Sequence, residues 1–341
     1  MKRILLALLI LFAAPLAADA RSKAIYGDDN RKEYFEVSKE RQAQADSVVS
    51  LWDNSKVSAM TGGFLLSGRP FMNKVFNREG GKICDSEPFR DQRIGAECSG
   101  TLVGEDLVMT AGHCIKEQHD CDEMKVVFDY NIKTQGGKAP SVVPDSSVYS
   151  CKAIVSSRLE LSRKAEGEAG PSLSQDYAII RLDRKVTGRK PLPINRKGGL
   201  ADGAPLYTIG HPVGLPAKIA DNAAVINIRQ GYNFFEANLD TYGGNSGSGV
   251  FNAETGLLEG ILVRGRDDFH KTPDGCYSSE VFAQKPEDGG ESVTKISTVA
   301  GFIPELGAET VQQVPVAVQS GELKAATRAG IAWEQLTGRE K

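Results

Sequence analysis

Short apolar runs, separated by Gly, Pro, Asn and Asp, constrain the fold of this chain more than any other feature of its sequence. The runs are rich in β-branched residues and occupy positions 48–52, 100–103, 107–110, 125–128, 178–182, 206–209, 224–228 and 258–263. Runs of this length between turn residues are typical of β-strands, and many in succession indicate an all-β sandwich or barrel. We therefore predict an all-β fold that begins near Ser47. The polar stretch 158–174 predicts a long surface loop.

The first 46 residues predict processing rather than a folded core. Lys2 and Arg3 precede a short apolar run, and an Ala-x-Ala sequence ends at Ala20. This order is that of a signal peptide, predicted here for residues 1–20. The alternative is a retained membrane anchor, for which the run is short. Residues 21–46 are polar and charged, and predict a propeptide or an N-terminal arm.

The composition changes again at the C-terminal end of the chain. Residues 306–341 form a tail in which 321–339 are rich in Ala, Glu, Lys and Leu. This composition predicts one C-terminal helix beyond the barrels.

Six cysteines in an exported chain predict disulfides. They are Cys84, Cys98, Cys114, Cys121, Cys151 and Cys276. A zinc site is the rival interpretation, but the chain has no Cys-x-x-Cys pair and no finger spacing. Six cysteines allow 15 pairings, which the residues alone leave open.

The net charge argues against nucleic-acid and membrane partners. A formal net charge of −3 gives no basic footprint for nucleic acid and no polybasic membrane anchor. The acidic run 119–123 could bind calcium, but a solvated charge run is the favoured interpretation. We expect no metal and no cofactor. After signal cleavage we expect a secreted or periplasmic monomer whose partners are protein or peptide substrates.

Three segments carry residues suited to acyl transfer. His113 follows an apolar strand, Asp176 opens one, and Ser246 lies in the Gly-rich run 243–249. Acyl transfer needs a hydroxyl nucleophile, a base and a group that orients the base, which Ser, His and Asp supply. The backbone N–H groups of Gly244 and Ser246 could form the oxyanion hole. Each residue alone has a structural explanation, but their joint occurrence at strand boundaries favours a catalytic triad.

The three segments resemble those of the chymotrypsin/trypsin family of serine proteases. Thr-Ala-Gly-His-Cys at 110–114 is similar to the family's Thr-Ala-Ala-His-Cys, and the strand after Asp176 also matches. Gly-Asn-Ser-Gly-Ser at 244–248 resembles the bacterial branch that includes the staphylococcal glutamyl endopeptidase. Residues 28–31 and 210–216 also resemble the corresponding segments of that branch. The resemblance covers residues 47–305 and implies two six-stranded antiparallel β-barrels with the active site between them.

The resemblance also implies disulfide pairs. Cys98–Cys114 fits the family's bridge beside the base. Cys121–Cys151 and Cys84–Cys276 then remain as the other two pairs.

Departures from the family pattern concern activation and specificity. Asn245 replaces the aspartate that pairs with a new N-terminus in trypsin, so activation by that ion pair is not expected. Asp240 falls at the floor of the family's specificity pocket, where a carboxylate favours Arg or Lys, unless Arg264 neutralises it. Tyr242 replaces a pocket-wall cysteine. The substrate-binding residues implied are Asp240, Thr241, Val263 and Gly265.

Rival functions fit the sequence less well. An α/β-hydrolase needs Gly-x-Ser-x-Gly and the order Ser, acid, His, whereas this chain has the order His, Asp, Ser. A binding-only adhesin or pseudoprotease would not need the triad. A heat-shock protease would need a PDZ domain, for which the tail is too short. We predict a serine endopeptidase.

Overall fold

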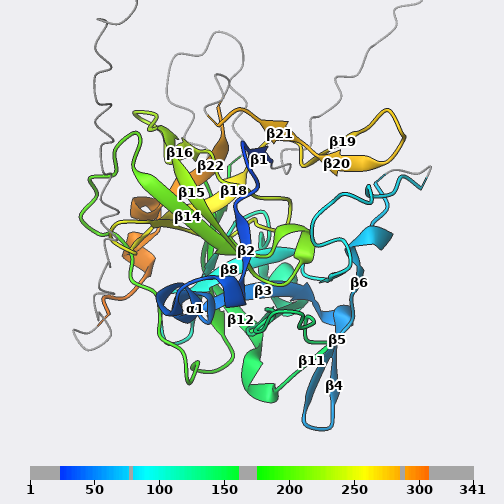
Figure 1. Ribbon diagram of the computed structural model, residues 1–341. Helices are drawn as coiled ribbons and strands as arrows, with labels where there is room; N and C mark the ends of the chain where they lie inside the picture. The colour runs from blue at the N-terminus through cyan, green and yellow to red at the C-terminus, as the bar shows by residue number, and fades with distance from the viewer. Residues whose placement is uncertain (1–23, 77–79, 161–174, 285–288, 307–341) are drawn as a thin grey trace, which may run out of the picture.

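Two β-barrels make up most of the chain. The computed structural model describes residues 24–76, 80–160, 175–284 and 289–306 (Figure 1). The predicted signal peptide and C-terminal helix lie outside the described residues. No described helix is long and apolar enough to cross a bilayer.

The first barrel is a closed antiparallel sheet of six strands in the order β10-β12-β13-β9-β8-β3. Its strands are β3 (Val48–Asp53), β8 (Cys98–Leu102), β9 (Leu107–Thr110), β10 (Met124–Val127), β12 (Val148–Leu159) and β13 (Asp176–Leu182). The predicted surface loop therefore starts later than expected, because Arg158 and Leu159 still pair with Tyr177 and Asp176 in the barrel.

The second barrel also closes with six antiparallel strands, because β14 pairs with both β17 and β15. Its strands are β14 (Pro205–Gly210), β15 (Lys218–Asn227), β16 (Phe234–Ala237), β17 (Gly249–Asn252), β18 (Leu258–Arg264) and β22 (Glu291–Lys295). The all-β, two-barrel prediction is confirmed, and the fold is chymotrypsin-like.

Alternation along β13 shows why its sequence is apolar on both faces. Ala178 and Ile180 point into the core of the first barrel. Tyr177 and Ile179 belong instead to a second core, which also contains Ile261 from the second barrel. A strand buried on both faces loses the apolar–polar alternation of a half-exposed strand. The second core joins the two barrels.

Smaller elements surround the barrels. They are β1 (Ile25–Tyr26), β2 (Arg31–Glu33), α1 (Lys39–Ala45), β4 (Val57–Met60), β5 (Gly63–Leu66), β6 (Arg69–Pro70), β7 (Arg93–Ile94), α2 (Gln118–Asp122), β11 (Val142–Val143), β19 (Phe269–Lys271), β20 (Tyr277–Ser279) and β21 (Val281–Phe282). Short 3₁₀ turns are η1 (Tyr34–Glu36), η2 (Asn54–Lys56), η3 (Phe71–Asn73), η4 (Asp145–Ser147), η5 (Pro212–Gly214), η6 (Ile296–Thr298) and η7 (Ala300–Phe302).

Residues 24–33 are built into the second barrel. β2 adds to the barrel beside β15, and β1 pairs in parallel with β21 (Figure 1). Ala24, Ile25 and Tyr26 are almost completely buried. The N-terminal arm of the sequence prediction therefore has a fixed place, and it lies beside the segment that leads to Ser246.

Candidate active site

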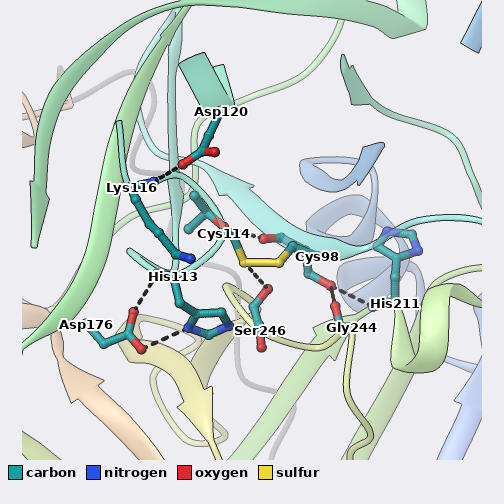
Figure 2. The surroundings of a disulfide bond; sticks show 11 residues. Cys98, His113, Cys114, Lys116, Asp120, Asp176, His211, Gly244 and Ser246 are labelled. Atoms are coloured by element: carbon teal, nitrogen blue, oxygen red, sulfur yellow. Dashed lines mark hydrogen bonds and ion pairs between the residues drawn. A yellow bond between two sulfur atoms is a disulfide. The ribbon is translucent and has the colours of Figure 1, made fainter. Parts of the chain in front are cut away.

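His113 and Asp176 form a hydrogen-bonded pair at the edge of the first barrel. His113 Nδ1 lies 2.9 Å from Asp176 Oδ2, and the His113 backbone N–H donates to Oδ1 at 3.1 Å (Figure 2). Because an ionised carboxylate only accepts, this geometry places the ring proton on Nδ1 and leaves Nε2 as an acceptor. Asp176 is buried and His113 is 11% exposed, so the pair can reach a substrate only through the imidazole.

Local packing fixes where each member of the pair lies. Asp176 is the first residue of β13, and its carbonyl accepts a hydrogen bond from Thr294 of the second barrel at 2.8 Å. His113 lies in the turn after β9, where a Cβ on Gly112 would come within 2.0 Å of the Arg158 carbonyl oxygen. Only glycine permits that approach of β12. The Ala-Gly-His sequence is therefore a packing requirement of the turn.

Ser246 lies in a tight turn between β16 and β17. Gly244 has φ +95° and Gly247 has φ +90°, and a Cβ on Gly247 would lie 2.1 Å from the Ser99 carbonyl oxygen. Both positions therefore need glycine, one on each side of the serine. Ser246 lies between His113 and Gly244, beneath the Cys98–Cys114 disulfide (Figure 2). We call the segment 240–248 the serine turn.

One cavity brings these groups together. It has a volume of about 230 Å³, and it is lined by Glu97, Cys98, His113, Cys114, Met124, Gly243, Gly244 and Ser246. The cavity thus contains the predicted base, the predicted nucleophile and one predicted oxyanion donor. In the described part of the chain, the Gly244 N–H donates no hydrogen bond.

Ser99 holds the serine turn in place, a role that nothing in the sequence indicates beyond its position next to Cys98. Its backbone N–H donates to the Ser246 carbonyl at 2.8 Å. Its hydroxyl donates to the Gly244 carbonyl at 2.8 Å and accepts from the His211 N–H at 2.9 Å. Ser99 is fully buried, so these bonds are shielded from water. One residue of the first barrel thereby positions the turn of the second.

Two further contacts fix the serine turn from the other side. Asp268 accepts the Gly243 N–H with both carboxylate oxygens, at 3.1 and 3.0 Å. The Asn245 carboxamide oxygen accepts from the Ser248 hydroxyl at 3.3 Å and is buried. Asn245 therefore takes part in a neutral hydrogen bond where trypsin has an ion pair.

The predicted specificity residues lie outside the cavity beside Ser246. Asp240 accepts the backbone N–H of Tyr26 at 2.7 Å and that of Asn30 at 2.8 Å, so both oxygens contact the N-terminal arm. Burial raises the pKa of Asp240 to about 6 despite these two donors. Val263 is fully buried and belongs to the core between the barrels.

Thr241 and Gly265 both lie against the carboxylate of Glu291, a residue that the sequence analysis did not identify. The Thr241 hydroxyl donates to Glu291 Oε2 at 2.9 Å, and the Tyr26 hydroxyl donates to Oε1 at 3.1 Å. A Cβ on Gly265 would lie 2.0 Å from Glu291 Oε2, so the absence of a side chain there makes room for the carboxylate. Glu291 is completely buried.

Tyr242 contacts the N-terminal arm, and no disulfide braces it. The guanidinium of Arg31 lies 4.0 Å from the Tyr242 ring centroid and donates to its hydroxyl at 2.8 Å. Arg31 also pairs with Asp29 at 2.6 Å. The arm thus touches the serine turn at Asp240, Thr241 and Tyr242, where Thr241 N–H donates to the Ala24 carbonyl at 3.0 Å.

The remaining sequence candidates have structural roles. Asp120, in the acidic run, accepts the N–H groups of Lys116 and Glu117 at the start of α2. His211 is buried and its Nδ1 donates to the Leu215 carbonyl at 3.0 Å, which closes a turn. Burial lowers the pKa of His211 to about 4. The ring is therefore neutral near pH 7.

Three disulfides are present, and they are the pairs that the resemblance implied. They join Cys84 to Cys276, Cys98 to Cys114 and Cys121 to Cys151. The donor atoms of Cys98, His113 and Cys114 lie within 4.8 Å of one another, but the two sulfurs are joined to each other and offer no thiolates. Three disulfides fit an oxidising, extracellular environment.

Two six-stranded barrels with a His–Asp pair and a serine on one cavity define a chymotrypsin-like architecture. Residues 98–261 match the family model described as the trypsin-like peptidase domain. None of the curated proteins compared is similar to the chain. The match covers the segments that contain His113, Asp176 and Ser246, and with the two-barrel fold it supports a protease of the chymotrypsin/trypsin-like family.

Proposed function

We propose that this chain is a serine endopeptidase with His113, Asp176 and Ser246 as its catalytic triad. The observation that carries the proposal is the single cavity that contains both the His113 imidazole and Ser246, with the Asp176 carboxylate bonded to the far side of the ring. The alternative of a binding-only barrel gives no reason for a buried carboxylate behind an accessible histidine.

The mechanism is acyl transfer in two halves. Ser246 Oγ attacks the peptide carbonyl carbon while His113 Nε2 takes its proton. The C–N bond then breaks, and the leaving amine takes that proton from His113. A water molecule then attacks the acyl-enzyme in the same way, with His113 as the base, which releases the carboxylic acid and restores Ser246. The N–H groups of Gly244 and Ser246 stabilise the oxyanion, and Asp176 stabilises the imidazolium.

For specificity we propose cleavage after Arg or Lys. Two buried carboxylates support this, since Asp240 precedes Thr241 in the serine turn and Glu291 of β22 accepts the Thr241 hydroxyl. Glu291 lies against Gly265, a residue expected to line the substrate pocket. A buried carboxylate favours a cationic side chain through a charge-assisted hydrogen bond. Cleavage after Glu would instead place the substrate carboxylate near these two carboxylates, which have the same charge.

Export through the signal peptide, a monomeric state and a bacterial origin close to the staphylococcal glutamyl endopeptidase branch belong to the same proposal. Residues 1–20 and the disulfides support export, and the Gly-Asn-Ser-Gly-Ser motif supports the bacterial branch. The substrates proposed are proteins and peptides, with no cofactor.

The decisive experiment is labelling of the purified protein with a fluorophosphonate. We expect Ser246 to be labelled, and we expect Ser246→Ala to lose labelling and at least about 10⁴-fold in kcat. Ser58→Ala is the control, because it removes an exposed hydroxyl on β4 outside the serine turn and retains the nucleophile. Absence of labelling in a folded protein would contradict the proposal.

A panel of peptides that differ only in the residue before the scissile bond measures specificity. We expect Arg and Lys substrates to be hydrolysed with higher kcat/KM than Ala or Glu substrates. Equal rates for all four would refute the Arg/Lys preference without affecting the proposed mechanism.

A further inference from the structure

A second and larger cavity adjoins the catalytic cavity. Its volume is about 490 Å³, and its lining includes Gly95, Ala96 and Val213. Ala96 is followed by Glu97 and Cys98, which line the catalytic cavity. The Val213 N–H donates to the Gly243 carbonyl at 2.5 Å. The two cavities therefore share the chain segment 95–98 and are linked again through the serine turn.

The lining of this second cavity is cationic. Lys56, Arg69 and Lys74 contribute to it, and no acidic residue does. Glu97, from the neighbouring cavity, pairs with Lys56 at 2.9 Å. Within the described residues, Arg69 and Lys74 form no ion pair. Burial lowers the pKa of Lys74, the charge of Asp268 raises it, and the charge of Arg69 lowers it further, so Lys74 lies within electrostatic reach of both groups.

The lining residues and the chemistry of the site favour the leaving-group side of Ser246 for the second cavity. The acyl half of a substrate must direct its carbonyl at Gly244 N–H, with its side chain toward Thr241 and Gly265. The leaving amine takes its proton from His113 and departs along the side of the cavity that Cys98, Cys114 and Glu97 line. Continuing beyond Glu97, an extended chain that advances about 3.3 Å per residue reaches the segment 94–96.

We propose that this cavity is a subsite that binds acidic side chains within three residues after the scissile bond. The inference rests on the proposed peptidase function and adds a second element of specificity to it. Arg69 can hold a carboxylate through two N–H donors, whereas Lys74 contributes a point charge. The subsite selects the leaving half of the substrate, and the pocket near Thr241 selects the acyl half.

Quenched peptides with one acyl half, and Glu, Ala or Lys at the second and third positions after the scissile bond, test the subsite. The residue before the bond is the one that the specificity panel selects. We expect kcat/KM to fall from Glu to Ala to Lys, by about fivefold per step, as is typical of partly exposed charge pairs. We expect 0.5 M NaCl to reduce the differences in kcat/KM among the three kinds of peptide, because salt screens such charge pairs.

The double variant Arg69→Gln with Lys74→Gln should abolish the ranking. Lys152→Gln, which removes an exposed cation from β12 outside both cavities, should retain it. A nitroanilide substrate, which ends at the scissile bond, reports on the acyl half alone. Wild-type protein that hydrolyses the peptides with equal kcat/KM would overturn the subsite and leave the peptidase proposal standing. A protein that neither hydrolyses any substrate nor reacts with a fluorophosphonate would overturn both.

Discussion

Asp240 carries a carboxylate that folding removes from water. Its two oxygens accept the Tyr26 and Asn30 N–H groups, and it is 3% exposed. These donors stabilise the charged form, but desolvation outweighs them and raises the pKa to about 6. The residue thus connects the serine turn to the N-terminal arm at an electrostatic cost near neutral pH.

This pKa has a direct consequence for stability. An aspartate in an unfolded chain has a pKa near 3.9, so between about pH 4 and pH 6 the folded protein binds this proton more tightly. The free energy of unfolding from this source therefore falls as the pH rises through that window, by about 3 kcal/mol, and is constant above it. Urea unfolding at pH 4, 5, 6 and 7 measures the effect.

Asp240→Asn should remove that pH dependence, so its stability relative to wild type should improve from pH 4 to pH 6. Asp183→Asn, at a carboxylate that is 40% exposed, is the control and should leave the dependence in place. A constant difference between wild type and Asp240→Asn from pH 4 to pH 7 would show that the buried group does not titrate in this range.

At the residue scale, the sequence was informative where chemistry imposes a motif. His113, Asp176 and Ser246 stand in motifs whose neighbours are fixed by tight turns, and the structure brings His113 and Ser246 to one cavity. Ser99 and Glu291 could not be found in this way. Each acts through contacts with residues far along the chain, and Ser or Glu in a strand carries no local signature of such contacts.

The N-terminal arm acts as a brace for the serine turn. β2 attaches it to β15 of the second barrel, and β1 attaches it to β21. Asp29, between the two strands, forms an ion pair with Arg31 of β2, and the Arg31 guanidinium stacks on Tyr242. Arg31 is 6% exposed, so its charge depends on these partners. Such a pair is costly to break, because removal of one member leaves the other without its counter-charge.

Arg31→Ala should therefore lower the free energy of unfolding by about 3 kcal/mol. It should also slow fluorophosphonate labelling, since Tyr242 precedes Gly243 and Gly244 in the serine turn. Lys32→Ala is the matched control from the same strand, where the side chain is 44% exposed and the expected loss is below about 1 kcal/mol. Equal effects of the two variants on stability and labelling would contradict the bracing role.

At the element scale, the apolar runs predicted most barrel strands. Their positions correspond to β3, β8, β9, β10, β13, β14, β15 and β18. β12 was missed because it is only partly buried along most of its length and contains Lys and Ser. The sequence of the N-terminal arm is polar and does not predict burial. The arm is nevertheless built into the fold, because its charged residues find partners there, such as Lys218, which pairs with Glu33 at 3.0 Å.

In the molecule as a whole, one disulfide joins segments far apart in sequence. Cys84 and Cys276 are separated by 192 residues, whereas the other two pairs close spans of 16 and 30 residues within the first barrel. The cross-link holds the segment before β7 against the hairpin β19–β20, where the Cys84 N–H donates to the Tyr277 carbonyl at 2.8 Å. A long span restricts the unfolded chain more than a short one.

Replacing both Cys84 and Cys276 with Ala should lower the free energy of unfolding by about 2–5 kcal/mol. Urea unfolding of the double variant and of wild type under non-reducing conditions measures the loss. The two remaining disulfides serve as the internal control, because mass spectrometry can verify that they stay paired. A loss well below 1 kcal/mol would mean that other contacts already fix the hairpin.

The pairing of β1 with β21 also sets an order of events during synthesis. Ile25 and Tyr26 are among the earliest of the described residues to be made, yet their partners Val281 and Phe282 come some 256 residues later. A nascent chain therefore lacks the contacts that the N-terminal arm makes with the serine turn. Completion of the site has to wait until nearly all of both barrels has been made, so the finished site exists only at the end of synthesis.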